Sequence, residues 1–234
     1  MREDRYARQL WLPEIGAAGQ ARMAQTRVLL VGVGGLGSPV AQYLVGMGIG
    51  TLGLVDDDVV SVSNLHRQIL YSEQQVGQPK VACAAARLRG LNSEVSIEEH
   101  PGRFTPEVAD AMLASYDMVV DGCDNFATRF AIDEACARRG IPYIYGAVCG
   151  FEGQTSVFHY GDHPHTYRTL HPDKDAVLAM PHPGKAVIGM TPGVVGCVMA
   201  TQVLQLATGA KPSLAGQLWT IDLRTMEAHT FQLP

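Results

Sequence analysis

The 234 residues, of which 47% are hydrophobic and 18% charged, exclude a disordered chain and suit one α/β domain, expected over 1–234. The net charge of −5 excludes a broad basic face, so no nucleic-acid partner is expected. No run of about 18 apolar residues is present, so no membrane span is expected either.

Five cysteines are present, and none of them are spaced as CxxC: Cys83, Cys123, Cys136, Cys149 and Cys197. This spacing favours small buried thiols in a reducing compartment over a disulfide framework. The charged N-terminus lacks the apolar core of a signal peptide. We therefore expect a cytoplasmic location.

The first elements predict a nucleotide-binding unit. Residues 1–25 are expected to form a helical arm. Residues 27–31 are short, apolar and β-branched, which predicts a buried parallel strand before the glycine cluster at 32–37. A helix over 38–47 and a strand over 51–55 are expected next. This order is the βαβ unit.

The same alternation continues as far as residue 150. Further helices are expected at 79–89, 106–115 and 125–139, and further strands at 94–98, 117–121 and 142–146. Alternation of this kind predicts a Rossmann-like, doubly wound and mostly parallel sheet with helices on both faces. Residues 26–150 are thus expected to be the nucleotide-binding part.

Residues 151–234 have a different character, and we expect a substrate-binding loop, a helix and closing strands there. The expected elements are a strand at 154–160, a mobile loop at 161–185, an apolar helix at 193–207 and an antiparallel hairpin of 218–222 with 228–233. The loop is inferred from its content of His, Pro, Asp and Gly without periodicity.

A glycine motif follows the first strand. Gly32, Gly34 and Gly37 fit GxGxxG, and Asp56 ends the next strand. Glycines let the backbone approach a nucleotide, and the carboxylate of Asp56 can accept hydrogen bonds from ribose hydroxyls. On these features alone, an NAD-dependent oxidoreductase is as good an interpretation as any other.

Two cations and an acid change this interpretation. Arg67 lies in a polar stretch, Lys80 opens a helix, and Asp124 follows a strand. The carboxyl ends of parallel strands face one crevice, so these residues can converge near Asp56. Two cations can offset the charge of a triphosphate, and an acid can hold Mg²⁺. Hydride transfer has no use for them.

Neighbouring charges have plain structural interpretations. Asp57 and Asp58 are expected to be solvated turn residues. Asp121 is expected to cap the turn after its strand. A plain structural interpretation of Arg129 is an ion pair with an acid on a helix face.

Several motifs together resemble the ThiF/MoeB/HesA family, the bacterial relatives of the ubiquitin-activating enzymes. They are RYARQ at 5–9, GVGGLG at 32–37, SNLHRQ at 63–68, GQPK at 77–80 and the pair Asp124-Asn125. The resemblance covers residues 4–232.

The resemblance implies ATP and Mg²⁺ as cofactors. Asp56 would hold the ribose, Asn64 with Arg67 and Lys80 the phosphates, and Asp124 the Mg²⁺. The implied nucleotide-binding set is Gly34, Gly35, Asp56, Ser63, Asn64, Leu65, His66, Arg67, Gln68, Lys80, Asp124 and Asn125. The implied catalytic set is Arg8, Arg67, Lys80 and Asp124, with Arg8 reaching into the other subunit of a homodimer.

The implied partner is a small ubiquitin-like sulfur-carrier protein ending in Gly-Gly, of the thiamine or the molybdopterin type. Its terminal carboxylate would attack the α-phosphate, giving an acyl-adenylate and pyrophosphate. That carboxylate is already ionised at pH 7, so the enzyme needs neither a nucleophile nor a general base. Alternatives are adenylation of another peptide or protein tail, an NAD-dependent oxidoreductase, and a non-catalytic scaffold subunit, which should lack some of these charges.

The chain departs from the family in its cysteines. Many relatives hold a structural zinc with two CxxC pairs, but Thr166–Thr169 stands at the first pair and no second pair occurs before Pro234. We predict no structural zinc. The spacing of His163, His165, His171 and His182 fits no tetrahedral site and indicates a solvated loop. Some relatives also use a loop cysteine to bind the carrier covalently, and the corresponding place in this chain is near His182. No cysteine lies between Cys149 and Cys197. We therefore predict adenylation without a covalent enzyme–carrier intermediate.

Overall fold

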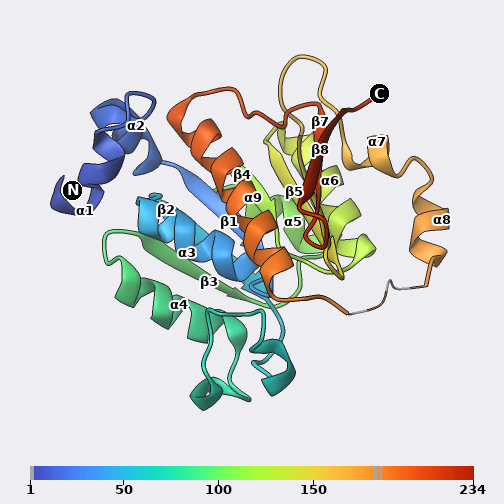
Figure 1. The fold of residues 1–234 in the computed structure, drawn as a ribbon, viewed down its shortest axis with the longest axis horizontal. Helices are drawn as coiled ribbons and strands as arrows, with labels where there is room; N and C mark the ends of the chain where they lie inside the picture. The colour runs from blue at the N-terminus through green and yellow to red at the C-terminus, as the bar shows by residue number, and fades with distance from the viewer. Residues whose placement is uncertain (1–2, 182–183, 185) are drawn as a thin grey trace.

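A computed structural model describes residues 3–181, 184 and 186–234, and in this part of the chain the strands form one sheet (Figure 1). The strands are β1 (Arg27–Val31), β2 (Thr51–Asp56), β3 (Ser96–Pro101), β4 (Met118–Asp121), β5 (Tyr143–Cys149), β6 (Glu152–Phe158), β7 (Gln217–Asp222) and β8 (Glu227–Gln232). Their order is β3-β2-β1-β4-β5-β6-β7-β8. Strands β1 to β5 are parallel and β6 to β8 antiparallel, which confirms the predicted fold and hairpin.

Helices cover both faces of the sheet (Figure 1). They are α1 (Glu3–Leu10), α2 (Gly16–Met23), α3 (Gly37–Met47), α4 (Lys80–Leu91), α5 (Pro106–Leu113), α6 (Phe126–Arg139), α7 (Tyr167–Leu170), α8 (Lys174–Ala179) and α9 (Met190–Thr208). Helices α3, α4 and α9 pack on one face, and α5 and α6 on the other.

Strand β1 shows why the sheet must be covered on both sides. Val28 and Leu30 belong to the core under α3 and α9, while Leu29 and Val31 belong to the core under α5 and α6. Successive side chains of a strand point to opposite faces, so an apolar run without polar alternation requires two cores. This is what the sequence predicted for residues 27–31.

The ends of β1 and β4 touch at one glycine. Gly32 has φ +90°, and a Cβ there would lie 2.6 Å from the backbone of Gly122. Only glycine allows this conformation and approach without strain. The loops that follow β1 and β4 are therefore brought against each other, and both carry predicted site residues.

Several predicted elements differ in the structure. The arm expected over 1–25 contains the two helices α1 and α2, and the strand expected at 154–160 is β6, Glu152–Phe158. Strand β3 begins at Ser96 and not at residue 94, because its register is set by pairing with β2, where Thr51 lies opposite Ser96. The loop predicted at 161–185 contains the short helices α7 and α8. Asp173 caps α8 by accepting a hydrogen bond from the Ala176 N–H at 2.9 Å. Helices this short show no 3.6-residue periodicity, so the pattern did not indicate them.

Helix α9 has the length and the apolar composition of a membrane-spanning helix, with a mean hydropathy of 1.3 over 18 residues. Half of that window is buried inside the protein, where α9 packs on α3, β5 and β6. A central core helix has the same composition, so length and hydropathy alone are weak evidence for a span. The sequence has no uninterrupted apolar run of this length, because Thr and Gln interrupt the helix.

The cysteines differ in burial. Cys83 and Cys136 are buried, as predicted, whereas Cys149 is exposed at the end of β5 and the other two are half-buried. None of the five forms a disulfide.

Candidate active site

A cavity of about 1430 Å³ opens at the carboxyl ends of the parallel strands and continues over β5, β6 and β7. It brings together ten of the residues predicted to bind nucleotide. They are Gly34, Gly35, Asp56, Ser63, Asn64, His66, Arg67, Gln68, Asp124 and Asn125. Among the described residues that were predicted for the site, Leu65, Lys80 and Arg8 do not line it. Leu65 instead packs against the apolar core.

The glycine-rich turn contacts the loop at 63–68. A Cβ at Gly34 would lie 3.5 Å from Gln68 Nε2, and one at Gly35 would lie 3.6 Å from Arg67 Cδ. The loop begins as a 3₁₀ helix, Val62–Asn64. Glycines at the turn leave a space that a side chain would fill, and this space lies beside Arg67.

Gln68 is buried, with 4% of its surface exposed, and its Oε1 has no hydrogen-bond partner among the described residues. A buried acceptor without a partner is costly in a folded protein. Because Gln68 lines the cavity beside the glycine-rich turn, the side-chain amide is available to a bound molecule.

Asp56 is fixed at the end of β2 by two backbone amides. Val33 N donates to Asp56 Oδ2 at 2.8 Å, and Asp58 N donates to Asp56 Oδ1 at 2.9 Å. Burial raises the pKa of Asp56, and the charge of Lys80 acts against this shift. The carboxylate therefore faces the cavity in a fixed orientation beside the glycine-rich turn.

Asp57 and Asp58 are exposed, as expected, and each is also paired with a cation. Asp58 Oδ2 lies 2.8 Å from Lys80 Nζ, and Asp57 Oδ2 lies 2.6 Å from Arg103 Nε. Their carboxylates and that of Asp56 lie within 4.8 Å of one another. Two of the three are already paired with cations, which disfavours this triplet as the magnesium site.

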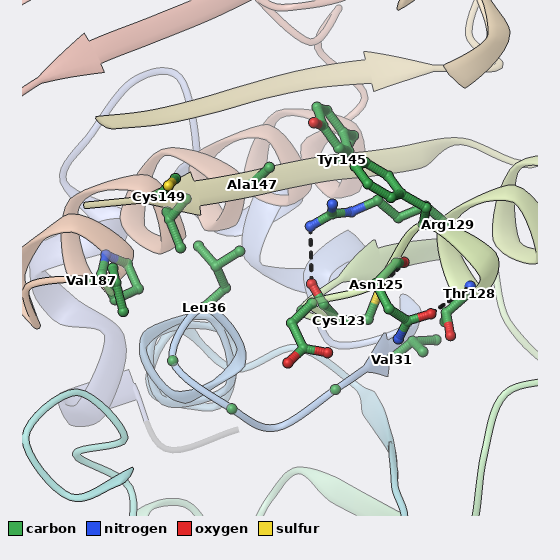
Figure 2. A pocket seen from close by; sticks show the side chains of 18 of the residues that line it. Val31, Leu36, Cys123, Asn125, Thr128, Arg129, Tyr145, Ala147, Cys149 and Val187 are labelled. Carbon is green, nitrogen blue, oxygen red and sulfur yellow. Dashed lines mark hydrogen bonds between the residues drawn. The ribbon is translucent and has the colours of Figure 1, made fainter. Parts of the chain in front are cut away.

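The loop after β4 is held by the buried side chain of Arg129, which Figure 2 shows hydrogen-bonded to Cys123. Arg129 Nε lies 3.2 Å from Asp121 Oδ2, and Arg129 Nη2 donates to the Cys123 carbonyl at 3.1 Å. Asp121 also accepts from Cys123 N at 2.9 Å, so the predicted turn cap is present. Arg129 thus pairs with a strand-end acid and not with a helix-face acid. Cys123 is thereby fixed just before the exposed Asp124.

Asn125 begins α6. Its Oδ1 accepts a hydrogen bond from Thr128 N at 2.9 Å, so it is the N-cap of the helix (Figure 2). An N-cap orients the loop before it, because its backbone leaves the helical conformation. Asn125 therefore lines the cavity and also places Asp124 at the helix N-terminus, next to the glycine-rich turn.

The sequence did not single out the walls beyond the nucleotide motifs. Tyr145, Gln154, Thr220 and His229 line the cavity from β5 to β8. Tyr145 lies beside Arg129 (Figure 2) and accepts a hydrogen bond from Gln154 Nε2 at 2.6 Å. Their joint placement follows from antiparallel pairing, in which Gln154 lies opposite Thr220 and Thr220 opposite His229. No local motif indicates such pairing.

Arg8 lies in the N-terminal arm, with its guanidinium carbon 4.7 Å from the ring centre of Trp11. The arm is attached to the edge of the domain by Tyr6, whose hydroxyl accepts a hydrogen bond from Asn92 Nδ2 at 2.8 Å. Arg8 is exposed and does not reach the cavity of its own chain.

The histidines of the 161–185 segment have separate environments. His165 lies 3.2 Å from the Pro234 carbonyl oxygen, and His171 packs on Tyr167 with ring centres 4.7 Å apart. Burial lowers the pKa of His171. His182 lies outside the described residues. Thr166 and Thr169, at the position of a zinc-binding pair in relatives, form the capping box of α7.

Known proteins are similar to this chain in sequence and in fold. A family model described as the ThiF family matches residues 6–234. The sulfur carrier protein adenylyltransferase of Thermus thermophilus is 45% identical over 224 residues, which is 94% of this chain and 83% of that protein. The SAMP-activating enzyme E1 of Haloferax volcanii is 41% identical over 228 residues, which is 97% of this chain and 84% of that protein.

A solved structure of E. coli MccB with ATP has a TM-score of 0.85 and 24% identity, over 98% of this chain and 71% of that one. At this identity the likeness shows the shared fold. The extent of the family match and the identity to the Thermus thermophilus protein establish the relationship. The chain belongs to the ThiF family.

Proposed function

We propose that the protein adenylates the C-terminal glycine carboxylate of a small ubiquitin-like sulfur carrier, using ATP and releasing pyrophosphate. The name of the Thermus thermophilus relative supports this reaction, and so does the name of the Haloferax volcanii relative. The observation that carries the proposal is the convergence of Asp56, Arg67 and Asp124 on one cavity beside the glycine-rich turn.

Each group has a physical role in this proposal. Asp56 accepts hydrogen bonds from the ribose hydroxyls, because its carboxylate is fixed at the end of β2. Gly34 and Gly35 let the backbone approach the phosphates. Arg67 and Lys80 offset negative charge as pyrophosphate leaves, which is stabilisation of the transition state. Asp124 would hold Mg²⁺, which would supply further neutralisation of the phosphate charge.

The nucleophile in this proposal belongs to the substrate. The carrier carboxylate is ionised at neutral pH, so catalysis consists of positioning it in line with the α-phosphate. The wall from Tyr145 to His229 continues the cavity beyond the nucleotide motifs. This is the wall that we assign to the carrier.

We also propose a homodimer. Arg8 does not reach its own cavity, so it is available to that of a second copy. The outer face of α3 and α9 is apolar, with Tyr43 60% and Met190 63% exposed. Exposed apolar patches commonly mark protein interfaces, and the half-buried Val198 lies on the same helix as Met190. A second copy on this face would cover them.

ATP–pyrophosphate exchange with candidate carriers ending in Gly-Gly tests the proposed function. We expect exchange with one carrier and none without a carrier. A carrier lacking its last glycine is the control and should give no exchange. Absence of exchange with every carrier, together with tight binding of NAD, would favour the oxidoreductase. Exchange with an unrelated peptide tail in place of a carrier would favour the peptide-modifying alternative.

Two further predictions of the sequence belong to this proposal. The lack of CxxC pairs leads us to propose an enzyme without structural zinc, which metal analysis of the purified protein tests. The five unpaired thiols suit a cytoplasmic enzyme, which cell fractionation tests.

A further inference from the structure

Lys80 is a buried cation in an unfavourable position. Its side chain is 5% exposed, so the ammonium group has lost most of its water. It is also the first residue of α4, where the helix dipole disfavours positive charge. A protonated amine in this position requires a nearby carboxylate.

Asp58 supplies that carboxylate and also holds the main chain of the same lysine. Asp58 Oδ2 lies 2.8 Å from Lys80 Nζ, and the Asp58 carbonyl accepts a hydrogen bond from Lys80 N at 3.0 Å. Val59, which follows Asp58, and Pro79, which precedes Lys80, form an isolated β-bridge. Lys80 is therefore held at both its backbone and its ammonium group.

Asp58 is in turn tied to the glycine-rich turn. Its N–H donates to Asp56 Oδ1 at 2.9 Å, and Val33 N donates to Asp56 Oδ2 at 2.8 Å. A continuous set of hydrogen bonds thus runs from the glycine-rich turn through Asp56 and Asp58 to Lys80. Asp58 lines the cavity and Lys80 does not, so the ion pair joins Lys80 to the cavity wall through Asp58.

We propose that Asp58 is a positioning residue that holds the Lys80 ammonium toward the triphosphate of ATP. An ammonium group has three donors, so one can stay on Asp58 while the others reach phosphate oxygens. The Asp58 side chain is 68% exposed, so its carboxylate remains accessible to solvent while it pairs with Lys80. This inference rests on the proposed use of ATP.

Asp57 provides a matched control within the same turn. Asp57 and Asp58 both line the cavity, and each is paired with one cation, Arg103 or Lys80. Removing either charge makes the cavity less negative, which by itself favours binding of a polyanion. Only Asp58→Asn also frees Lys80. The two variants are therefore expected to move ATP affinity in different directions.

The test is equilibrium binding of Mg·ATP and of adenosine to the full chain, without any carrier. Asp58→Asn should weaken Mg·ATP by about tenfold. It should change adenosine binding by no more than about twofold, because adenosine has no phosphate for Lys80 to contact. Asp57→Asn should bind Mg·ATP at least as tightly as the wild type. Asp58→Glu, which keeps the charge, should recover part of the lost affinity.

A double-mutant cycle with Lys80→Met completes the test. Asp58→Asn should add little to the loss already caused by Lys80→Met, because residues that act together are not additive. Equal loss of ATP and adenosine in Asp58→Asn would reduce Asp58 to a structural residue of the loop. Wild-type ATP affinity in Asp58→Asn would also overturn the proposal. Because no carrier is used, lack of pyrophosphate exchange would count against the proposed function alone.

Discussion

At the scale of single residues, Asp124 carries the clearest prediction for catalysis. It is exposed, lines the cavity and follows a loop held by the Asp121–Arg129 ion pair. We expect Asp124→Ala to lower pyrophosphate exchange by at least about a hundredfold, because the proposed magnesium contact is lost. Exchange assays measure this.

The control for this variant is Asp110→Ala, which removes an exposed carboxylate of α5 that pairs with Arg138. It should keep the wild-type exchange rate. Both variants should melt near the wild-type temperature, because exposed acids contribute little to stability. Normal exchange in Asp124→Ala would show that the magnesium ligand lies elsewhere.

Asp56 leads to a prediction about pH. It must be ionised to accept hydrogen bonds from the ribose, and burial raises its pKa above the usual value of 3.8. Affinity for adenosine should therefore be full above the raised pKa and fall as the pH drops through it, which begins at a higher pH than for an exposed Asp. Titrations of binding between about pH 4 and 7 measure this.

The matched variant is Asp56→Asn, which has no charge to titrate. It should bind adenosine weakly. Any decline in affinity at low pH that the variant shares with the wild type reflects protonation of the ligand. If the wild-type curve fell only where the variant's curve falls, Asp56 would not be the group that binds the ribose.

At the scale of elements, the arm formed by α1 is expected to act across a dimer. Arg8→Ala should be inactive, since no other cation of the arm is predicted to reach the site. Mixing Arg8→Ala with Asp124→Ala should restore about a quarter of the wild-type activity, because half of the dimers are mixed and each has one complete site. Exchange assays after subunit mixing measure this.

Confirmed subunit exchange without any recovery would contradict a role for Arg8 in the partner's site. Trp11 is 67% exposed beside Arg8, so its fluorescence can report whether the arm becomes covered on dimerisation. A dimer that left Trp11 fully exposed would also argue against the arm contacting the second copy.

Elements with a strong local signal were predictable. Strand β1 and helix α3 combine an apolar or small-residue pattern with a glycine turn between them, and the sequence indicated both within one residue. Helices α7 and α8 were not predictable. They have four and six residues, and contacts with α6 and the aromatic cluster around Tyr167 stabilise them more than propensity does.

At the scale of the whole molecule, we expect the activated carrier to leave without a covalent bond to this chain. Burial raises the pKa of Cys123 well above its usual range and raises that of Cys197 as well. Both thiols are thus poor nucleophiles at neutral pH. Intact-mass spectrometry after reaction with carrier and ATP should show only the unmodified mass.

If a covalent adduct with the carrier did form, we expect it on Cys149, because this thiol is exposed and lines the cavity. A carrier-sized adduct that a thiol reagent releases would overturn the prediction. Cys149→Ala would then have to abolish that adduct while keeping pyrophosphate exchange.

The sequence by itself determined the fold class, the family and the nucleotide motifs. It did so because a glycine turn, a strand-end acid and the SNLHRQ run are local patterns whose spacing is set by one βαβ unit. Only the tertiary structure decided the partners of Asp58 and Arg129 and the wall from Tyr145 to His229. These depend on contacts between residues far apart in the chain, and a charged side chain carries no local sign of which partner burial will bring to it.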